Sequence, residues 1–317
     1  MFPLVVSQLS KSYGSHQVVR DLTFTASPGR VTGFLGPNGA GKSTTMKILL
    51  DLAAADHGTA RIGDRRYRDL PEPARTVGVV LEPDAFHPGR SGRNHLRVLA
   101  DISGFSLQRI DEVLELVGLT DAAHRRVGAY SLGMRQRLCL AAALLGDPPV
   151  LVLDEPGNGL DPQGIHDLRA VLRDRAAQGH TIFVSSHLLA EVELLADDLV
   201  VVNKGRLITT GALDDLKQAA VTVRTPRAED LAVRLVAAGA AVEAGDAPET
   251  LTVRGLTTDL IGDLAHNAGI ALHELASGAG SLEEMFLRWT TDETKEKSRR
   301  SRLIPTAVTT RKEVVGS

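Results

Sequence analysis

Apolar and polar positions follow two different rhythms along the first two-thirds of the chain. Short β-branched runs, which indicate buried strands, lie at residues 31–35, 77–81, 150–153 and 181–185. Longer patterns with helical spacing lie at residues 44–52, 109–117, 135–145, 163–177 and 188–196. Because strands that alternate with helices usually form a sheet covered on both faces, these patterns predict an α/β fold with a mainly parallel sheet.

The residues before and after this alternating region have other patterns. Residues 4–24 have the pattern of an antiparallel hairpin. From about residue 219, short strand patterns at 221–225, 241–244, 251–254 and 270–275 enclose helical patterns at 228–238 and 258–267. A last helix is predicted at 281–289, where Ser281 and Glu284 have the spacing of a capping box. We therefore expect a first domain at 1–219, a small α+β domain at 220–290 and a flexible basic tail at 291–317.

Composition and charge narrow the class of protein. The 317 residues carry a formal net charge of −3, which gives no reason to expect a nucleic-acid partner. Cys139 is the single cysteine, so an internal disulfide is excluded. The sequence has no apolar run of the roughly 18 residues that cross a membrane, and its N-terminus lacks the pattern of a signal peptide. We expect a cytoplasmic protein.

A glycine-rich segment directly after the predicted strand 31–35 fits the phosphate-loop pattern G-x-x-x-x-G-K-[ST]. Its candidate nucleotide-binding residues are Gly36, Pro37, Asn38, Gly39, Ala40, Gly41, Lys42, Ser43 and Thr44. The glycines let backbone N–H groups surround phosphate oxygens, and the following helix adds a partial positive charge. Lys42 is placed to reach the β- and γ-phosphates, and the Ser43 hydroxyl is a candidate ligand of Mg²⁺.

Two carboxylates end the apolar strand pattern at 150–153. Asp154 is a candidate Mg²⁺ ligand, and Glu155 is a candidate general base that polarises the attacking water. Acidic residues at this end of a strand lie where open α/β sheets bind ligands. Together with the phosphate loop, this pair indicates hydrolysis of a nucleoside triphosphate.

Further motifs resemble those of the ATP-binding subunits of ABC transporters over residues 4–211. Tyr130, Ser131, Leu132, Gly133 and Met134 resemble the signature loop of that family. Asp161 lies in a segment similar to the D-loop, His187 resembles the switch histidine, and Tyr13 has the place of the aromatic residue that stacks on adenine. The resemblance implies a phosphate-loop ABC-type fold with an antiparallel β subdomain and a helical subdomain.

The family's mechanism gives these residues their implied roles. Two copies would form a head-to-tail dimer with two ATP molecules between them. Ser131 and the Gly133 backbone of one copy would contact the γ-phosphate held by the other. His187 would bind that phosphate and position water, and Asp161 would connect the two sites.

This chain departs from the family pattern at three positions. Glu82 stands where the glutamine loop normally has Gln, and we retain it as a candidate metal ligand. Leu132 and Met134 replace Gly and Gln of the signature, and this form resembles the bacitracin-resistance and drug-exporter-like branch. The branch implies an exporter whose separate multi-helix permease would dock near residues 83–104 and hold the chain on the inner face of the membrane.

Two other functions stay open at this point. A non-transport ABC ATPase that works on DNA or ribosomes generally carries a coiled-coil insertion, a zinc-binding cysteine set or a second cassette, none of which the sequence shows. A regulatory module that binds nucleotide but hydrolyses it weakly is compatible with Glu82. The basic tail, in turn, either contacts anionic lipid or is only solvated, and solvation is the preferred interpretation.

Overall fold

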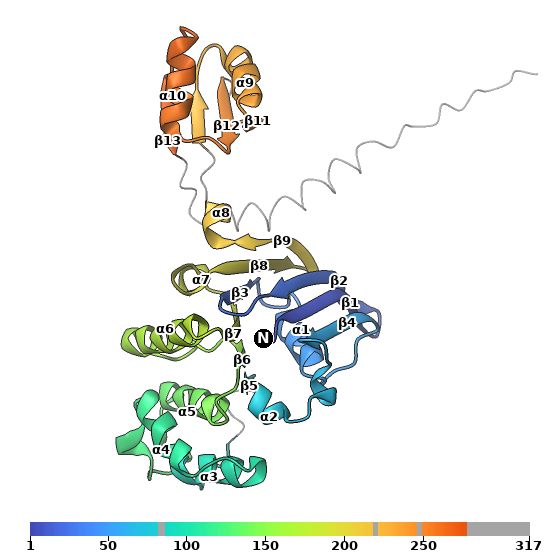
Figure 1. The fold of residues 1–317 in the computed structure, drawn as a ribbon, viewed down its shortest axis with the longest axis vertical. Coiled ribbons are helices and arrows are strands. Elements are labelled where there is room, and N and C mark those ends of the chain that lie inside the picture. The colour runs from blue at the N-terminus through green and yellow to red at the C-terminus, as the bar shows by residue number, and fades with distance from the viewer. Residues whose placement is uncertain (82–85, 218–220, 246–248, 278–317) are drawn as a thin grey trace, which may run out of the picture. The chain divides into compact units, whose positions relative to one another are not determined.

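The computed structural model describes residues 1–81, 86–217, 221–245 and 249–277 (Figure 1). Its largest sheet has six strands in the order β5-β6-β7-β3-β8-β9. These strands are β3 (Val31–Leu35), β5 (Val77–Val80), β6 (Val150–Asp154), β7 (Thr181–Ser186), β8 (Asp198–Asn203) and β9 (Arg206–Ala212). Only β9 is antiparallel to its neighbour, so the predicted mainly parallel sheet is confirmed. The predicted strands do not include β8 and β9.

Helices follow the strands much as predicted, with ends that differ by a few residues. The predicted helices correspond to α1 (Lys42–Leu49), α4 (Gln108–Leu116), α5 (Leu132–Leu144), α6 (Pro162–Ala177) and α7 (Leu189–Leu195). The short helices are α2 (Pro73–Thr76), α8 (Leu213–Lys217) and three 3₁₀ turns at Tyr67–Asp69, Thr120–Ala122 and Val127–Ala129. The helix α3 (Gly92–Ser103) is an addition, and the Ser91 hydroxyl caps it by accepting from Asn94 N–H at 3.2 Å.

An antiparallel sheet lies beside the parallel one. It has the order β2-β1-β4, with β1 at Leu4–Tyr13, β2 at His16–Ala26 and β4 at His57–Ile62 (Figure 1). The predicted hairpin is therefore confirmed, and β4 adds a third strand. Phe24 of β2 stacks against Phe183 of β7 and approaches Phe34 of β3, with ring centroids 5.4–5.5 Å apart. This aromatic cluster fixes β2 against the strand that precedes the phosphate loop.

The strand β6 shows why the central strands are apolar throughout. Its side chains alternate between two buried clusters. Leu151 and Leu153 pack in the cluster that contains the apolar residues of α5, whereas Val150 and Val152 pack in the cluster that contains the antiparallel sheet. Because both faces are covered, only the end of the strand reaches solvent, and the polar residues lie at that end.

Residues 221–277 form a second, four-stranded antiparallel sheet in the order β11-β12-β10-β13. Its elements are β10 (Val221–Arg224), α9 (Ala228–Ala237), β11 (Ala241–Ala244), β12 (Thr250–Arg254), α10 (Thr258–Asn267) and β13 (Glu274–Ser277). This is the β-α-β-β-α-β order of ferredoxin-like folds, with a core of its own. The predicted α+β character of this region is confirmed.

One strand of this sheet differs from its predicted position. We expected a strand at 270–275, but β13 begins only at Glu274. Ile270 is 5 % exposed and packs in the core from the preceding loop, which gives that loop the apolar pattern of a strand. Strand pairing begins beside His273, whose N–H donates to the Arg224 carbonyl at 2.8 Å. The predicted helix at 281–289 and the tail lie outside the described residues.

None of the helices in the described part of the chain combines the length and the apolar composition that a membrane span requires.

Candidate functional site

The loop between β3 and α1 depends on glycine at three positions. Gly39 and Gly41 have φ angles of +80° and +101°, in the left-handed region that favours glycine. A Cβ atom on Gly36 would lie 2.4 Å from the Val202 carbonyl oxygen. The loop leads into the first turn of α1, which has no acidic residue and no side-chain cap. Its N–H groups and helix dipole therefore suit an anion.

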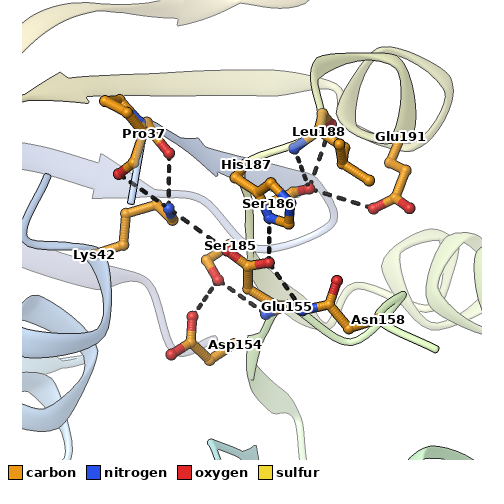
Figure 2. A network of polar contacts seen from close by, with 11 residues as sticks. Pro37, Lys42, Asp154, Glu155, Asn158, Ser185, Ser186, His187, Leu188 and Glu191 are labelled. Carbon is orange, nitrogen blue, oxygen red and sulfur yellow. Dashed lines mark hydrogen bonds and ion pairs between the residues drawn. The ribbon is translucent and has the colours of Figure 1, made fainter. Parts of the chain in front are cut away.

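Lys42 is the first residue of α1 and is 6 % exposed. Its Nζ donates to the Gly36 carbonyl at 2.7 Å and lies 3.6 Å from Glu155 Oε1 (Figure 2). Ser43 beside it is exposed, and Thr44 is half-buried. The ammonium group is thus held between the phosphate loop and the acidic end of β6.

Glu155 follows β6 directly and takes a left-handed backbone conformation, with φ at +48°. Figure 2 shows Lys42, Asn158 and His187 converging on its carboxylate. Asn158 Nδ2 donates to Oε2 at 3.0 Å, and His187 Nδ1 forms a short hydrogen bond with the same oxygen. With 20 % of its side chain exposed, Glu155 is open to water, while contacts with three side chains fix its orientation.

Asp154 is held by a different side chain. Its Oδ1 accepts a short hydrogen bond from the Ser185 hydroxyl, and the Ser185 oxygen accepts from the Glu155 N–H at 2.9 Å. The register of β6 and β7 places Asp154 opposite Ser185. One hydroxyl group therefore contacts both members of the acidic pair.

The segment that carries His187 has its own polar contacts. Ser186 Oγ accepts from the Leu188 N–H at 2.9 Å and lies 3.3 Å from Glu191 Oε2 (Figure 2). The His187 side chain is 34 % exposed. These contacts shape the turn from β7 into α7, and they direct the imidazole towards Glu155.

The signature residues lie at the start of α5. Ser131 is exposed and caps this helix by accepting from the Met134 N–H at 3.2 Å. Leu132 is 46 % exposed, and its side chain covers Gly159. A Cβ atom on Gly133 would lie 2.8 Å from the Gly159 carbonyl oxygen, so the two loops pack closely.

Asp161 and Tyr13 lie at the ends of other elements. Asp161 caps α6 by accepting from the Gly164 N–H at 3.0 Å, and Arg137 Nη2 of α5 lies 3.4 Å from the same oxygen. Tyr13 ends β1 with 53 % of its surface exposed, and the Lys11 ammonium lies 5.2 Å from its ring centroid. The exposed ring has the form of a stacking platform.

The structure thus brings the predicted residues into two groups. Lys42 and His187 both contact Glu155 directly, and Ser185 connects Asp154 to Glu155. Ser131, Leu132, Gly133 and Met134 form the second group at the start of α5, and this group packs against Gly159. Arg137, later in α5, lies 3.4 Å from Asp161. Ser185 is a functional candidate to which the sequence analysis gave no role. Its one signal in the sequence is its place at the end of the predicted strand at 181–185.

The donor atoms suit Mg²⁺ better than a transition metal. Within the described ranges, no three His, Cys, Asp or Glu side chains gather as a ready metal site. The Ser43 hydroxyl and the Asp154 carboxylate are hard oxygen donors, and Mg²⁺ bound with phosphates commonly takes only one or two carboxylates from the protein. Glu82, the third candidate ligand, lies outside the described residues.

Comparison with known proteins gives the same family. Residues 19–158 match the family model described as "ABC transporter", and residues 219–283 match a domain of unknown function, DUF8746. An uncharacterized ABC transporter ATP-binding protein, YhcH of Bacillus subtilis, is 43 % identical over 65 % of this chain and 68 % of its own length. The bacitracin transport ATP-binding protein BcrA of Bacillus licheniformis is 41 % identical over 67 % and 70 %. The lantibiotic transport ATP-binding protein SrtF of Streptococcus pyogenes is 39 % identical over 65 % and 89 %.

Solved structures agree in fold. An ATP-binding subunit of an ABC transporter superposes with a TM-score of 0.62 at 33 % identity, over 68 % of this chain and 91 % of that one. A nucleotide-free ATP-binding cassette gives a TM-score of 0.60 at 22 % identity, over 67 % and 92 %, which concerns the fold alone. The phosphate loop and the acidic end of β6 lie within the matched region. The chain belongs to the family of ABC transporter ATP-binding proteins, and it is an ATPase.

Proposed function

We propose that this chain is the ATP-hydrolysing subunit of an exporter and that hydrolysis occurs at the Glu155 carboxylate. The observation that carries the proposal is the convergence of Lys42 and His187 on that carboxylate. A lysine from a phosphate loop, a carboxylate and an imidazole supply phosphate binding, water activation and charge stabilisation within one small volume.

The nucleotide would bind along the loop of residues 36–44. Tyr13 stacks on adenine, the loop N–H groups surround the phosphates, and Lys42 bridges the β- and γ-phosphates. Ser43, Asp154 and Glu82 would hold Mg²⁺, which would neutralise phosphate charge. Since Lys42 already faces Glu155, the γ-phosphate would lie beside the base.

Glu155 would accept a proton from the attacking water as general base. Its oxygens are oriented by Asn158 and His187, so the carboxylate keeps one direction before substrate arrives. His187 would then hydrogen-bond the γ-phosphate and stabilise its charge. Catalysis by this arrangement is mainly positioning and electrostatics.

A second copy of the chain would complete each site. Ser131 is exposed at the start of a 13-residue helix, where the dipole favours an anion. We infer a head-to-tail homodimer in which Ser131, Leu132, Gly133 and Met134 cover ATP held by the partner copy, with Asp161 between the two sites. ATP would favour the closed dimer, and hydrolysis would reopen it.

Sedimentation of Glu155→Gln with and without ATP tests this dimer. We expect ATP to convert monomer into dimer and Ser131→Arg to prevent the conversion. The matched control is Ser106→Arg, because Ser106 is also an exposed serine at the start of a helix and accepts from the Gln108 N–H. ATP-bound protein that stays monomeric at every concentration would contradict the homodimer.

Export through a separate permease is the finer part of the proposal. Relatives are named for bacitracin and lantibiotic transport, two different cargos, which supports a cargo chosen by the permease. We propose a first domain at 1–219, an accessory domain at 220–290 and a tail at 291–317. The permease would dock near residues 83–104 and hold the chain on the inner face of the membrane.

The exposed side chain of Ile102 in α3 provides a test of this docking. The chain would be copurified with a candidate multi-helix permease, and ATPase activity would be measured in proteoliposomes. Ile102 is 78 % exposed, and Ile102→Asp should weaken copurification without unfolding the chain. Val233→Asp in α9, at 72 % exposure, is the control. Equal copurification of both variants would argue against docking at α3.

A further inference from the structure

Ser185 is completely buried at the carboxyl end of β7 and makes two polar contacts with consecutive residues of a neighbouring strand end. Its hydroxyl donates to Asp154 Oδ1 and accepts from the Glu155 N–H. A serine hydroxyl has one proton to donate, and here that proton goes to the carboxylate while the oxygen receives the amide. The contact pattern therefore has a fixed direction.

The two contacted residues have different chemical tasks in the proposed site. Asp154 is the metal ligand and Glu155 is the base, and they are adjacent in sequence. Glu155 also has a left-handed backbone, with φ at +48°, which is uncommon for a residue with a Cβ atom. The Ser185 bond to its N–H stabilises the backbone conformation that directs the Glu155 side chain towards Lys42 and His187.

We propose that Ser185 is a positioning residue that sets the orientation of the Asp154 carboxylate for Mg²⁺ and the backbone of Glu155 for water activation. The inference rests on the proposed site. Removal of a group that hydrogen-bonds to a metal-ligating side chain commonly lowers metal affinity or activity by about 10- to 100-fold. Loss of the hydroxyl should therefore change both metal binding and turnover.

The first measurement is the affinity for Mn²⁺ in the presence of a non-hydrolysable ATP analogue. Electron paramagnetic resonance monitors the binding. Ser185→Ala should raise the Mn²⁺ dissociation constant about 10-fold and leave binding of the analogue in EDTA unchanged. With ATP, kcat should fall about 10-fold or more while KM changes little. A general disturbance of the structure would weaken both Mn²⁺ binding and binding of the analogue in EDTA.

Matched variants make the test specific. Thr181 lies at the other end of β7, is also buried, and donates its hydroxyl proton to the Phe2 carbonyl at 2.8 Å. Thr181→Val removes a buried hydroxyl from the same strand and should leave Mn²⁺ affinity unchanged. Ser185→Thr restores a hydroxyl and should recover both properties. Ser185→Cys, with a weak thiol donor, substitutes if Ser185→Ala does not fold.

The outcomes distinguish this inference from the proposed site itself. Asp154→Ala should also weaken Mn²⁺ binding. If Asp154→Ala weakens Mn²⁺ binding while Ser185→Ala and Ser185→Cys bind Mn²⁺ normally, the proposed role of Ser185 is contradicted and the site assignment stands. If Asp154→Ala binds Mn²⁺ normally, the site assignment fails and the Ser185 inference fails with it. Weakened binding in Ser185→Ala, with recovery in Ser185→Thr, supports the inference.

Discussion

The Lys42 ammonium lies 3.6 Å from the Glu155 carboxylate and joins the phosphate loop to the acidic end of β6. Lys42 is nearly buried, and a buried charge is costly unless an opposite charge or hydrogen bonds accompany it. Glu155 and the Gly36 carbonyl provide these contacts. These contacts therefore fix the Lys42 ammonium between the phosphate loop and the end of β6.

Lys42→Ala should raise the ATP dissociation constant at least about 10-fold, which corresponds to about 1.4 kcal/mol of binding free energy. The physical reason is the loss of the one side-chain cation within the phosphate loop. Fluorescence titration with a labelled nucleotide measures the change. Lys47→Ala, later in the same helix, is the control and should bind normally. Unchanged affinity in Lys42→Ala would remove the basis of the nucleotide-site assignment.

Gly159→Ala should destabilise the chain through two separable effects. The residue has φ at +76°, and a Cβ atom would lie 2.4 Å from Leu132 Cδ2. Gly179→Ala has only the first effect, because its φ is +90° with open space around the new atom. We expect Gly159→Ala to cost about 1–3 kcal/mol more than Gly179→Ala in urea unfolding. Adding Leu132→Ala should recover part of the difference, and no recovery would show that Leu132 is not the obstacle.

Phe34→Ala should lower the free energy of unfolding by about 3–5 kcal/mol. The ring is fully buried, and its centroid lies 5.4 Å from that of Phe24 and 5.2 Å from that of Phe183. Phe34→Leu should cost less, because it retains most of the buried apolar volume. Urea unfolding followed by circular dichroism measures both variants. Equal small losses would mean that the aromatic cluster does not hold the two sheets together.

His95 should make stability depend on pH. Burial lowers the pKa of His95 below its ordinary value, and the positive charge of Arg90 acts in the same direction. The His95 imidazole therefore binds its proton near pH 6.5 in the unfolded chain, and only at lower pH in the folded chain. The contribution of His95 to the free energy of unfolding is fully present above about pH 6.5. It falls as the pH decreases towards the folded pKa, by at most about 1.4 kcal/mol per pH unit.

Urea unfolding of the wild type and His95→Gln at pH 7.5 and 5.5 measures this effect. The wild type should lose more stability between the two conditions than the variant does. Burial also lowers the pKa of His180, so the variant should retain a smaller pH dependence. Identical losses in the two proteins would exclude His95 as a source.

Sequence patterns predict the parts of this fold that depend on local chemistry. The phosphate loop is recognisable because close backbone packing at Gly36 and left-handed angles at Gly39 and Gly41 each require glycine. The strand β6 is recognisable because burial on both faces makes it wholly apolar until Asp154. In both cases the requirement lies within a few consecutive residues, so one sequence is sufficient.

Features that depend on partners distant in sequence are not predictable in this way. The contact of Ser185 with Asp154 exists because parallel pairing brings β7 into register with β6, across 31 positions of the chain. The helix α3 starts with Gly92, a poor helix former, and gains its stability from the Ser91 cap and from packing of Leu96 in the core. At Ile270 the sequence pattern predicts a strand that is absent, because this loop residue packs in the core as a strand residue would.

The rate of phosphate release under saturating ATP tests the role of Glu155 most directly. Glu155→Gln keeps the size of the side chain but removes the base, so the account predicts a fall of at least about 100-fold with ATP affinity little changed. Glu229→Gln, at an exposed position of α9, is the control and should release phosphate at the wild-type rate. A Glu155→Gln rate equal to that of the wild type would contradict hydrolysis at this carboxylate.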